Sequence, residues 1–120
     1  MAVRAIRGAI QVDVNEREAL LEGTAELVTE VMARNALDPG DVISVLFTTT
    51  PDLTVEFPAL AARKLGFGDV PLLCASEIDV PGAMPRIVRL LMHVETSLPR
   101  AAITHVYLRG ATALRLDIAQ

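Results

Sequence analysis

The residues with the clearest chemical potential in this 120-residue sequence are four arginines, Arg7, Arg63, Arg89 and Arg115. Each lies in or beside an apolar segment, where a permanent positive charge is unfavourable unless an anion meets it. No run of acidic residues matches the set, so it suggests a site for a ligand that carries several negative charges. No Ser/His/Asp set, metal-ligand spacing or glycine-rich phosphate loop accompanies them, and this favours chemistry done by positioning and fixed charge.

Each arginine also has an ordinary structural interpretation. Arg7 and Arg89 could lie across apolar surface with their charged ends in water. Arg63 falls in the last turn of a short predicted helix, where a cation favours the helix dipole. Arg115 lies near the end of the sequence, where surface arginines are common. For Arg63 and Arg115 the ordinary interpretation is sufficient by itself, so the joint arrangement carries the functional hypothesis.

Three other residue types could contribute to the same site: a thiol, a carboxylate and a phenol. Cys74 follows two leucines, which is usual for a core residue. Glu77, three residues further on, would face the opposite way in a continuing strand, so both reach one site only if the chain turns between them. Tyr107 is the only tyrosine and shares a strand face with His105. Neither His105 nor His93 has a cysteine or carboxylate at zinc-ligand spacing.

Composition predicts a globular chain that forms one domain over residues 1–120, since 52% of it is hydrophobic and 22% charged. The net charge of −4 argues against non-specific nucleic-acid binding. A single cysteine excludes an internal disulfide and favours a reducing compartment. No secretory signal pattern is present, and the apolar runs are too short to span a membrane. We therefore expect a cytoplasmic protein with no membrane or nucleic-acid partner.

Hydrophobic periodicity predicts the order βαβαβββ, an α+β fold in which one mixed β-sheet has one long and one short helix. Asn15 is a good N-cap for the long helix and forms an approximate capping box with Glu18. The predicted strands span residues 2–13, 42–50, 70–75, 86–95 and 103–114; the long helix spans 16–35, and a short one runs from Phe57-Pro58 to Gly66. The long helix is expected to cover one face of the sheet.

Alternation along the strands predicts that the arginines lie on the other face. Val88, Leu90, Met92 and Val94 share one side of their strand, which leaves Arg89 on the opposite side. The same rule puts Arg7 and Tyr107 on the face away from the helix, with Arg109 on the same face as Tyr107 and, if the last strand continues that far, Arg115 as well. A face that mixes apolar and charged groups is typical of a subunit interface that contains a site.

Several segments resemble, in order and at nearly the same spacing, those of one known family. They are Arg4-Ala5-Ile6-Arg7-Gly8-Ala9, Thr50-Pro51-Asp52-Leu53, Phe57-Pro58-Ala59 through Arg63, Val70-Pro71-Leu72-Leu73-Cys74 with Glu77, Asp79-Val80 with Gly82, Arg86 to Val94, His105-Val106-Tyr107-Leu108 and Leu114-Arg115-Leu116-Asp117. Together they resemble the monofunctional chorismate mutases of the Bacillus type, the small trimeric family that differs from the all-helical mutases.

The resemblance implies a homotrimer with a pseudo-barrel core and three active sites in clefts between subunits. One subunit would contribute Arg7, Cys74, Glu77, Arg89 and Tyr107, and the next would contribute Phe57 and Arg63. Arg115, in the C-terminal tail, would close over the mouth of the site. Some members of the family have lysine where this chain has Leu60, so carboxylate recognition would depend more on Arg63 and Arg115 here.

The implied reaction is the rearrangement of chorismate to prephenate in aromatic amino-acid biosynthesis, an intramolecular [3,3] shift that requires no cofactor or metal. On this interpretation Arg89 meets the ether oxygen, which gains negative charge as its C–O bond lengthens. Arg7 and Tyr107 hold a carboxylate, Glu77 accepts from the ring hydroxyl with Cys74 nearby, and Phe57 forms an apolar wall. Two alternatives remain open: a trimeric imine or enamine deaminase-like module, and a small carboxylate-binding or regulatory domain without chemistry.

Overall fold

The computed structural model describes residues 1–115 of the chain, and within them the fold is a five-stranded mixed sheet with the order β3-β2-β4-β1-β5. Its strands are β1 (Ala2–Gln11), β2 (Val42–Thr49), β3 (Leu72–Ser76), β4 (Ile87–Thr96) and β5 (Val106–Leu108). The central strand β4 runs antiparallel to β1 and β2, whereas β1 pairs in parallel with β5 and β2 with β3. The predicted α+β class and element order are confirmed.

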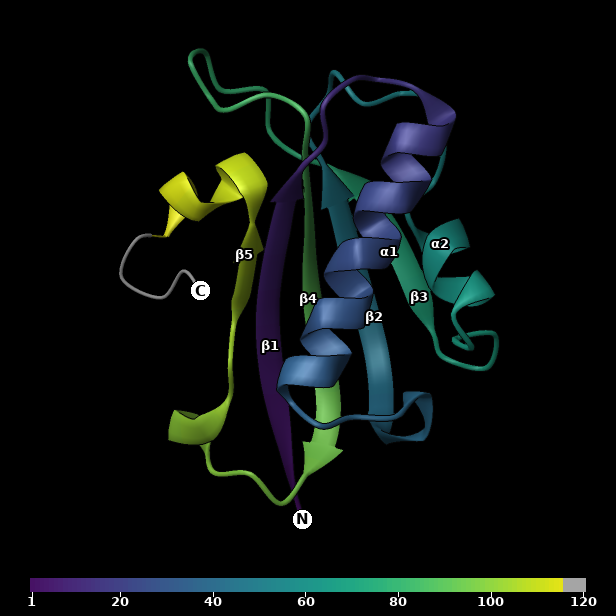
Figure 1. Cartoon of the computed structure of the whole chain (residues 1–120), viewed down its shortest axis with the longest axis vertical. Coiled ribbons are helices and arrows are strands. Elements are labelled where there is room, and N and C mark those ends of the chain that lie inside the picture. The colour runs from purple at the N-terminus through teal and green to yellow at the C-terminus, as the bar shows by residue number, and fades with distance from the viewer. Residues whose placement is uncertain (116–120) are drawn as a thin grey trace.

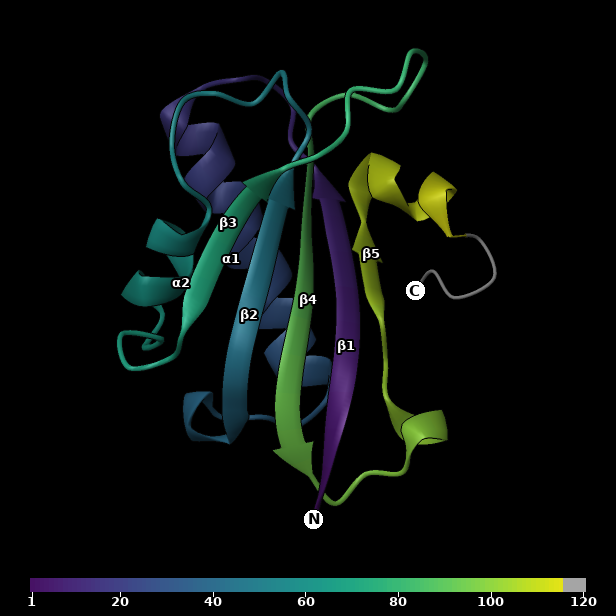
Figure 2. The ribbon, with the colours of Figure 1, turned by 180° about the vertical axis from the view of Figure 1, so that it is seen from behind.

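The long helix α1 (Arg17–Arg34) covers one face of the sheet, and the short helix α2 (Ala59–Lys64) lies beside it near β3 (Figure 1). Seen from behind, the opposite face of the sheet carries neither helix (Figure 2). Short 3₁₀ turns at Pro39–Asp41, Arg100–Ala102 and Arg109–Leu114 complete the elements. None of the helices in residues 1–115 combines the length and apolar character needed to cross a membrane.

The core lies between α1 and the sheet. Leu27, Val28 and Val31 of the helix are fully buried, as are Val88 and Met92 of β4. This confirms that the apolar side of β4 faces the helix, and it leaves Arg89 on the open face.

Two glycines allow the helix to approach the sheet closely. A Cβ atom on Gly8 would lie 3.2 Å from a methyl carbon of Leu27, and one on Gly23 would lie 2.7 Å from Val12. Glycine in a helix interior lowers helix stability by about 1 kcal/mol relative to alanine. The contact with Val12 shows why Gly23 is nevertheless suited to this position.

The predicted cap of α1 is wrong. The N-cap position is Glu16, with no side-chain capping bond. Asn15 instead bonds to Thr54 in the loop after β2: its Oδ1 accepts from the Thr54 N–H and its Nδ2 donates to Oγ1, both at 3.1 Å. The polar side chain therefore docks a distant loop on the start of the helix, which a local sequence pattern does not indicate.

The fifth strand is much shorter than predicted. It ends at Leu108, and Arg109 begins a 3₁₀ segment with a left-handed backbone angle, φ 53°. The change of direction ends strand alternation, so the prediction that Arg109 and Arg115 extend the face of Tyr107 as one strand is wrong. The Arg109 side chain turns to α1 and pairs with Glu26 at 3.0 Å.

Candidate active site

The face of the sheet away from α1 holds a pocket of about 320 Å³ between β2, β4, β1 and β5. Its charged and polar lining consists of Arg7, Thr48, Arg89, Tyr107 and Arg115. These residues come from separate elements, but the sheet register brings them together: Ala9 pairs with Arg89 on one side and with Tyr107 on the other. The structure thus gathers four of the predicted site residues in one place.

Arg89 is held from one side by Glu77. The Nε group of Arg89 donates to Oε2 of Glu77 at 3.0 Å, and the hydroxyl of Thr48 donates to the same oxygen at 2.6 Å. The Glu77 backbone N–H also donates to Thr49 at 2.9 Å, which fixes the carboxylate at the end of β3. Because only Nε is used, the two terminal nitrogens of Arg89 keep all their N–H groups for a ligand, with no hydrogen bond to residues 1–115.

Thr48 was not among the predicted site residues. It lies opposite Arg89 in the β2–β4 pairing, with its hydroxyl against Glu77. Cross-strand pairing puts such residues side by side on one face. A signal was available, since the end of β2 is rich in threonine, but the sequence alone did not show which threonine faces the arginine.

Arg7 is positioned through its backbone. Its N–H donates to Nδ1 of His105 at 2.9 Å, just before β5 begins its regular pairing with β1 at Val106. Nδ1 is therefore an acceptor and the imidazole is neutral with its proton on Nε2. The Arg7 guanidinium forms no ion pair with an acid in residues 1–115, so it offers an uncompensated charge to the pocket.

Burial lowers the pKa of His105 from its usual 6.5, and the positive charges of Arg7 and Arg115 lower it further. A depressed histidine pKa means that the unfolded chain takes up this proton more readily than the folded one. Stability is therefore full above about pH 6.5 and falls as the pH drops from there through the folded-state pKa.

We expect the free energy of unfolding to decrease between about pH 7.5 and pH 5.5 less steeply in His105→Asn than in the wild type. Asparagine keeps an acceptor near the position of Nδ1 but does not titrate. The difference in slope is at most about 1.4 kcal/mol per pH unit, since one proton is involved. Urea denaturation at a fixed protein concentration measures this slope. Equal slopes for the two proteins would show that His105 does not contribute to the pH dependence of the free energy of unfolding.

Phe57 and Cys74 lie elsewhere, in a second groove of about 360 Å³ between β3 and the loop after β2. Cys74 pairs with the core residue Phe47 and packs against the core, so its side chain faces the helix side, whereas Glu77 faces the other. We expected Cys74 to lie with Arg7 and Arg89 in the site residues of one subunit, but within one chain it lies in the groove that contains Phe57. The reason is strand alternation, which turns the Cys74 side chain to the face opposite that of Glu77.

Arg63 lies on α2 with an exposed side chain, and it contributes to neither hollow. Leu60 lies one turn earlier on the same helix and is half-buried. Within one chain, Arg63 and Phe57 are therefore separated from the arginine-lined pocket. Arg115 is the last residue described, and the rest of the predicted tail, from Leu116 onward, lies outside the described residues.

The pocket has the chemistry of an anion site. Arg7, Arg89 and Arg115 line it, and Glu77, the carboxylate that holds Arg89 within residues 1–115, is paired with that arginine. Fixed cations in a hollow of this size suit a small molecule with more than one carboxylate. Residues 1–115 contain no cluster of three or more histidine, cysteine, aspartate or glutamate side chains able to hold a metal ion. The fold and pocket define a small α+β protein with a cationic small-molecule site.

Comparison with known proteins identifies the family. Residues 3–118 match the family model described as chorismate mutase type I. The chain is 44% identical to the chorismate mutase AroH of Thermus thermophilus over 97% of its length and 96% of the relative's. It is 40% identical to AroH of Bacillus subtilis, covering 98% of this chain and 94% of that one. A solved chorismate mutase from Clostridium thermocellum superposes with a TM-score of 0.90 at 43% identity, covering 92% of this chain and 98% of that one.

The chain belongs to the chorismate mutase type I family, and it is a chorismate mutase, an isomerase of aromatic biosynthesis. The predicted family, fold class and activity are confirmed. The deaminase-like and binding-module alternatives are not favoured by any of these matches.

Proposed function

We propose that the pocket lined by Arg7, Arg89, Tyr107 and Arg115 is where this chain rearranges chorismate to prephenate. The observation that carries the proposal is the Arg89–Glu77–Thr48 arrangement, which holds the guanidinium of an arginine that lines a cationic pocket. The reaction is intramolecular, so the protein has two tasks. It holds the flexible dianion in a compact conformer, and it offers fixed positive charge where negative charge develops.

Arg89 is the group assigned to the ether oxygen. That oxygen gains negative charge as its C–O bond lengthens, and a donor already oriented by Glu77 needs no reorganisation at that moment. Arg7 and Tyr107 are assigned to one substrate carboxylate, on the opposite side of the pocket from Glu77. The second oxygen of Glu77, Oε1, accepts no hydrogen bond from residues 1–115, which leaves it available for the ring hydroxyl.

We further propose a homotrimer whose sites lie between subunits, with Phe57, Arg63 and Cys74 supplied by the neighbour. Phe57, Leu73 and Ile78 are exposed at 66%, 65% and 87%, and they lie in and around the edge strand β3. Exposed apolar side chains along a sheet edge are typical of a surface that another chain covers. Arg115 would close the site, residues 1–120 would form one domain, and the protein would be cytoplasmic.

Size-exclusion chromatography with light scattering, coupled to an assay of chorismate loss, tests this proposal directly. We expect the activity to elute with a mass of three chains and to need no added metal or cofactor. A stable monomer with full activity would contradict a site that is shared between subunits, because the neighbour's residues would then be unnecessary. Absence of activity from a correctly folded trimer would contradict the assignment of the pocket.

A further inference from the structure

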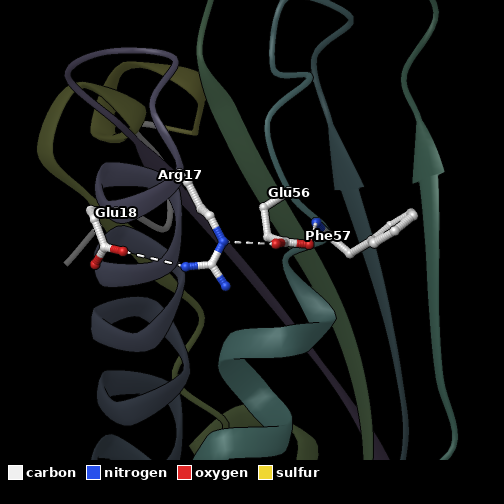
Figure 3. Close-up of polar contacts among 4 residues, drawn as sticks. All are labelled: Arg17, Glu18, Glu56 and Phe57. Atoms are coloured by element: carbon white, nitrogen blue, oxygen red, sulfur yellow. Dashed lines mark hydrogen bonds and ion pairs between the residues drawn. The ribbon is translucent and has the colours of Figure 1, made fainter.

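Phe57 is a large apolar side chain exposed to solvent at the end of a loop. Exposure of such a side chain is unfavourable, so contacts of its backbone must keep it in this position. Figure 3 shows its ring directed away from α1, while its backbone N–H points back to Glu56. Its carbonyl oxygen accepts from the N–H of Leu60 at 3.1 Å, which ties it to α2 on the C-terminal side. On the other side the only hydrogen bond within residues 1–115 is the one that the Phe57 N–H donates to the Glu56 carboxylate.

Glu56 makes two contacts with its two oxygens. Oε1 accepts from the Phe57 N–H at 3.0 Å, and Oε2 accepts from Nε of Arg17, the first residue of α1, also at 3.0 Å (Figure 3). The Glu56 side chain is only 21% exposed, compared with 79% for Glu18, the other partner of Arg17. Glu56 is thus a bridge between the long helix and the backbone of Phe57.

A second pair of hydrogen bonds runs alongside this bridge. Asn15 and Thr54, each two residues earlier in its own segment, bind one another through two hydrogen bonds of 3.1 Å. The two contacts dock the loop on the start of α1 at two neighbouring points. Of these two contacts, only the one made by Glu56 extends to Phe57, because the Glu56 carboxylate also accepts from the Phe57 N–H.

We propose that Glu56 is a positioning residue for Phe57: anchored by Arg17, it fixes the backbone so that the ring is presented outward as a wall of the neighbouring subunit's site. This inference rests on the proposed function, in which Phe57 lines that site. In this proposal Glu56, which lines the same groove as Phe57, acts through the backbone of Phe57, so its effect is on the fraction of protein in which Phe57 is ready to bind.

The ionisation of Glu56 agrees with this role. The Phe57 N–H lowers the pKa of the carboxyl below its usual 4.5, and the hydrogen bond from Arg17 lowers it further. The carboxylate therefore stays charged, and keeps its hold on Phe57, to a lower pH than a free glutamate would. The contribution is present above about pH 4.5 and is lost as the pH falls through the lowered value.

The test is steady-state kinetics of chorismate loss in Glu56→Ala, with Glu18→Gln as the matched control. We expect KM to rise about 3- to 10-fold with kcat nearly unchanged, because a smaller competent fraction weakens binding but not the bound reaction. Glu18→Gln removes the other ion pair of Arg17 and should match the wild type. Arg17→Met, which leaves the Glu56 carboxylate but removes its anchor, should show an intermediate rise.

A double-mutant cycle with Phe57→Ala shows whether the effect passes through the ring. In the Phe57→Ala background, Glu56→Ala should add no further increase in KM. Amide hydrogen exchange of Phe57, measured without substrate, should accelerate in Glu56→Ala and not in Glu18→Gln. Unchanged exchange, or a full KM effect in the absence of the ring, would overturn the inference. If exchange accelerates but Phe57→Ala itself leaves KM unchanged, the result contradicts the proposed function, in which Phe57 lines the site, and not the role of Glu56 in fixing the Phe57 backbone.

Discussion

Replacement of Arg89 by alanine is expected to lower kcat by about two to three orders of magnitude, the usual effect of removing one preorganised donor to developing charge. The side chain is half-buried and lies on the open face of β4, so its removal leaves the core between the sheet and α1 intact. Glu77 keeps the hydrogen bond from Thr48. The loss should therefore appear in kcat and not in the folded fraction measured by circular dichroism.

Arg89→Lys should also be poor. An ammonium group can pair with Glu77 or meet the ether oxygen, but it lacks the planar fork that does both at once through Nε and the terminal nitrogens. Arg109→Ala is the matched control, since Arg109 pairs with Glu26 of α1. It should retain wild-type turnover. Near wild-type turnover in either Arg89 variant would assign the ether-oxygen role to another residue.

Alternation of side chains explains why so much of the site could be predicted from sequence. Arg7 and Arg89 lie on long, regular strands whose apolar residues point to α1, so both arginines had to share the open face. Tyr107 also met this prediction, although β5 has only three residues, because they pair in register with β1. Where strands pair regularly, side-chain alternation within each strand also determines which residues of distant strands share a face.

The predictions failed where the backbone leaves regular geometry or where a polar side chain bonds to a distant segment. The left-handed φ of Arg109 ends β5, and arginine is not a residue type that indicates such a backbone angle. Asn15 had a suitable type and position for a helix cap, but its side chain forms two hydrogen bonds with Thr54 and does not cap α1. The Glu56–Arg17 pair joins residues 39 positions apart and has no local pattern at all.

The largest gain of activity is expected from mixing two impaired variants, Arg63→Ala and Arg89→Ala. In one chain Arg89 lines the pocket on the open face, whereas Arg63 lies on α2 and does not reach it. If both serve one site, they must come from different subunits. Each variant alone then damages every site of its trimer, because every site needs one arginine of each kind.

Mixed rings should restore some sites completely. In a cyclic trimer each site uses one edge of the ring, and every mixed ring has one edge where the Arg63→Ala subunit supplies Arg89 and its neighbour supplies Arg63. Random equal mixing makes roughly three quarters of the trimers mixed, so about one quarter of all sites are intact. Co-refolding should thus raise activity to about a quarter of the wild-type value, far above the mean of the parents.

The experiment requires that mixing itself is verified. Native mass spectrometry of subunits that differ by a mass tag reports the fraction of mixed trimers, and the wild type refolded in the same way sets the full scale. Arg63→Ala mixed with Arg63→Ala carrying the tag is the matched control and should gain nothing. If mixed trimers form and activity stays at the parental mean, the two arginines do not act across a subunit boundary, and Arg63 has only the helix-end role that its exposed position on α2 permits.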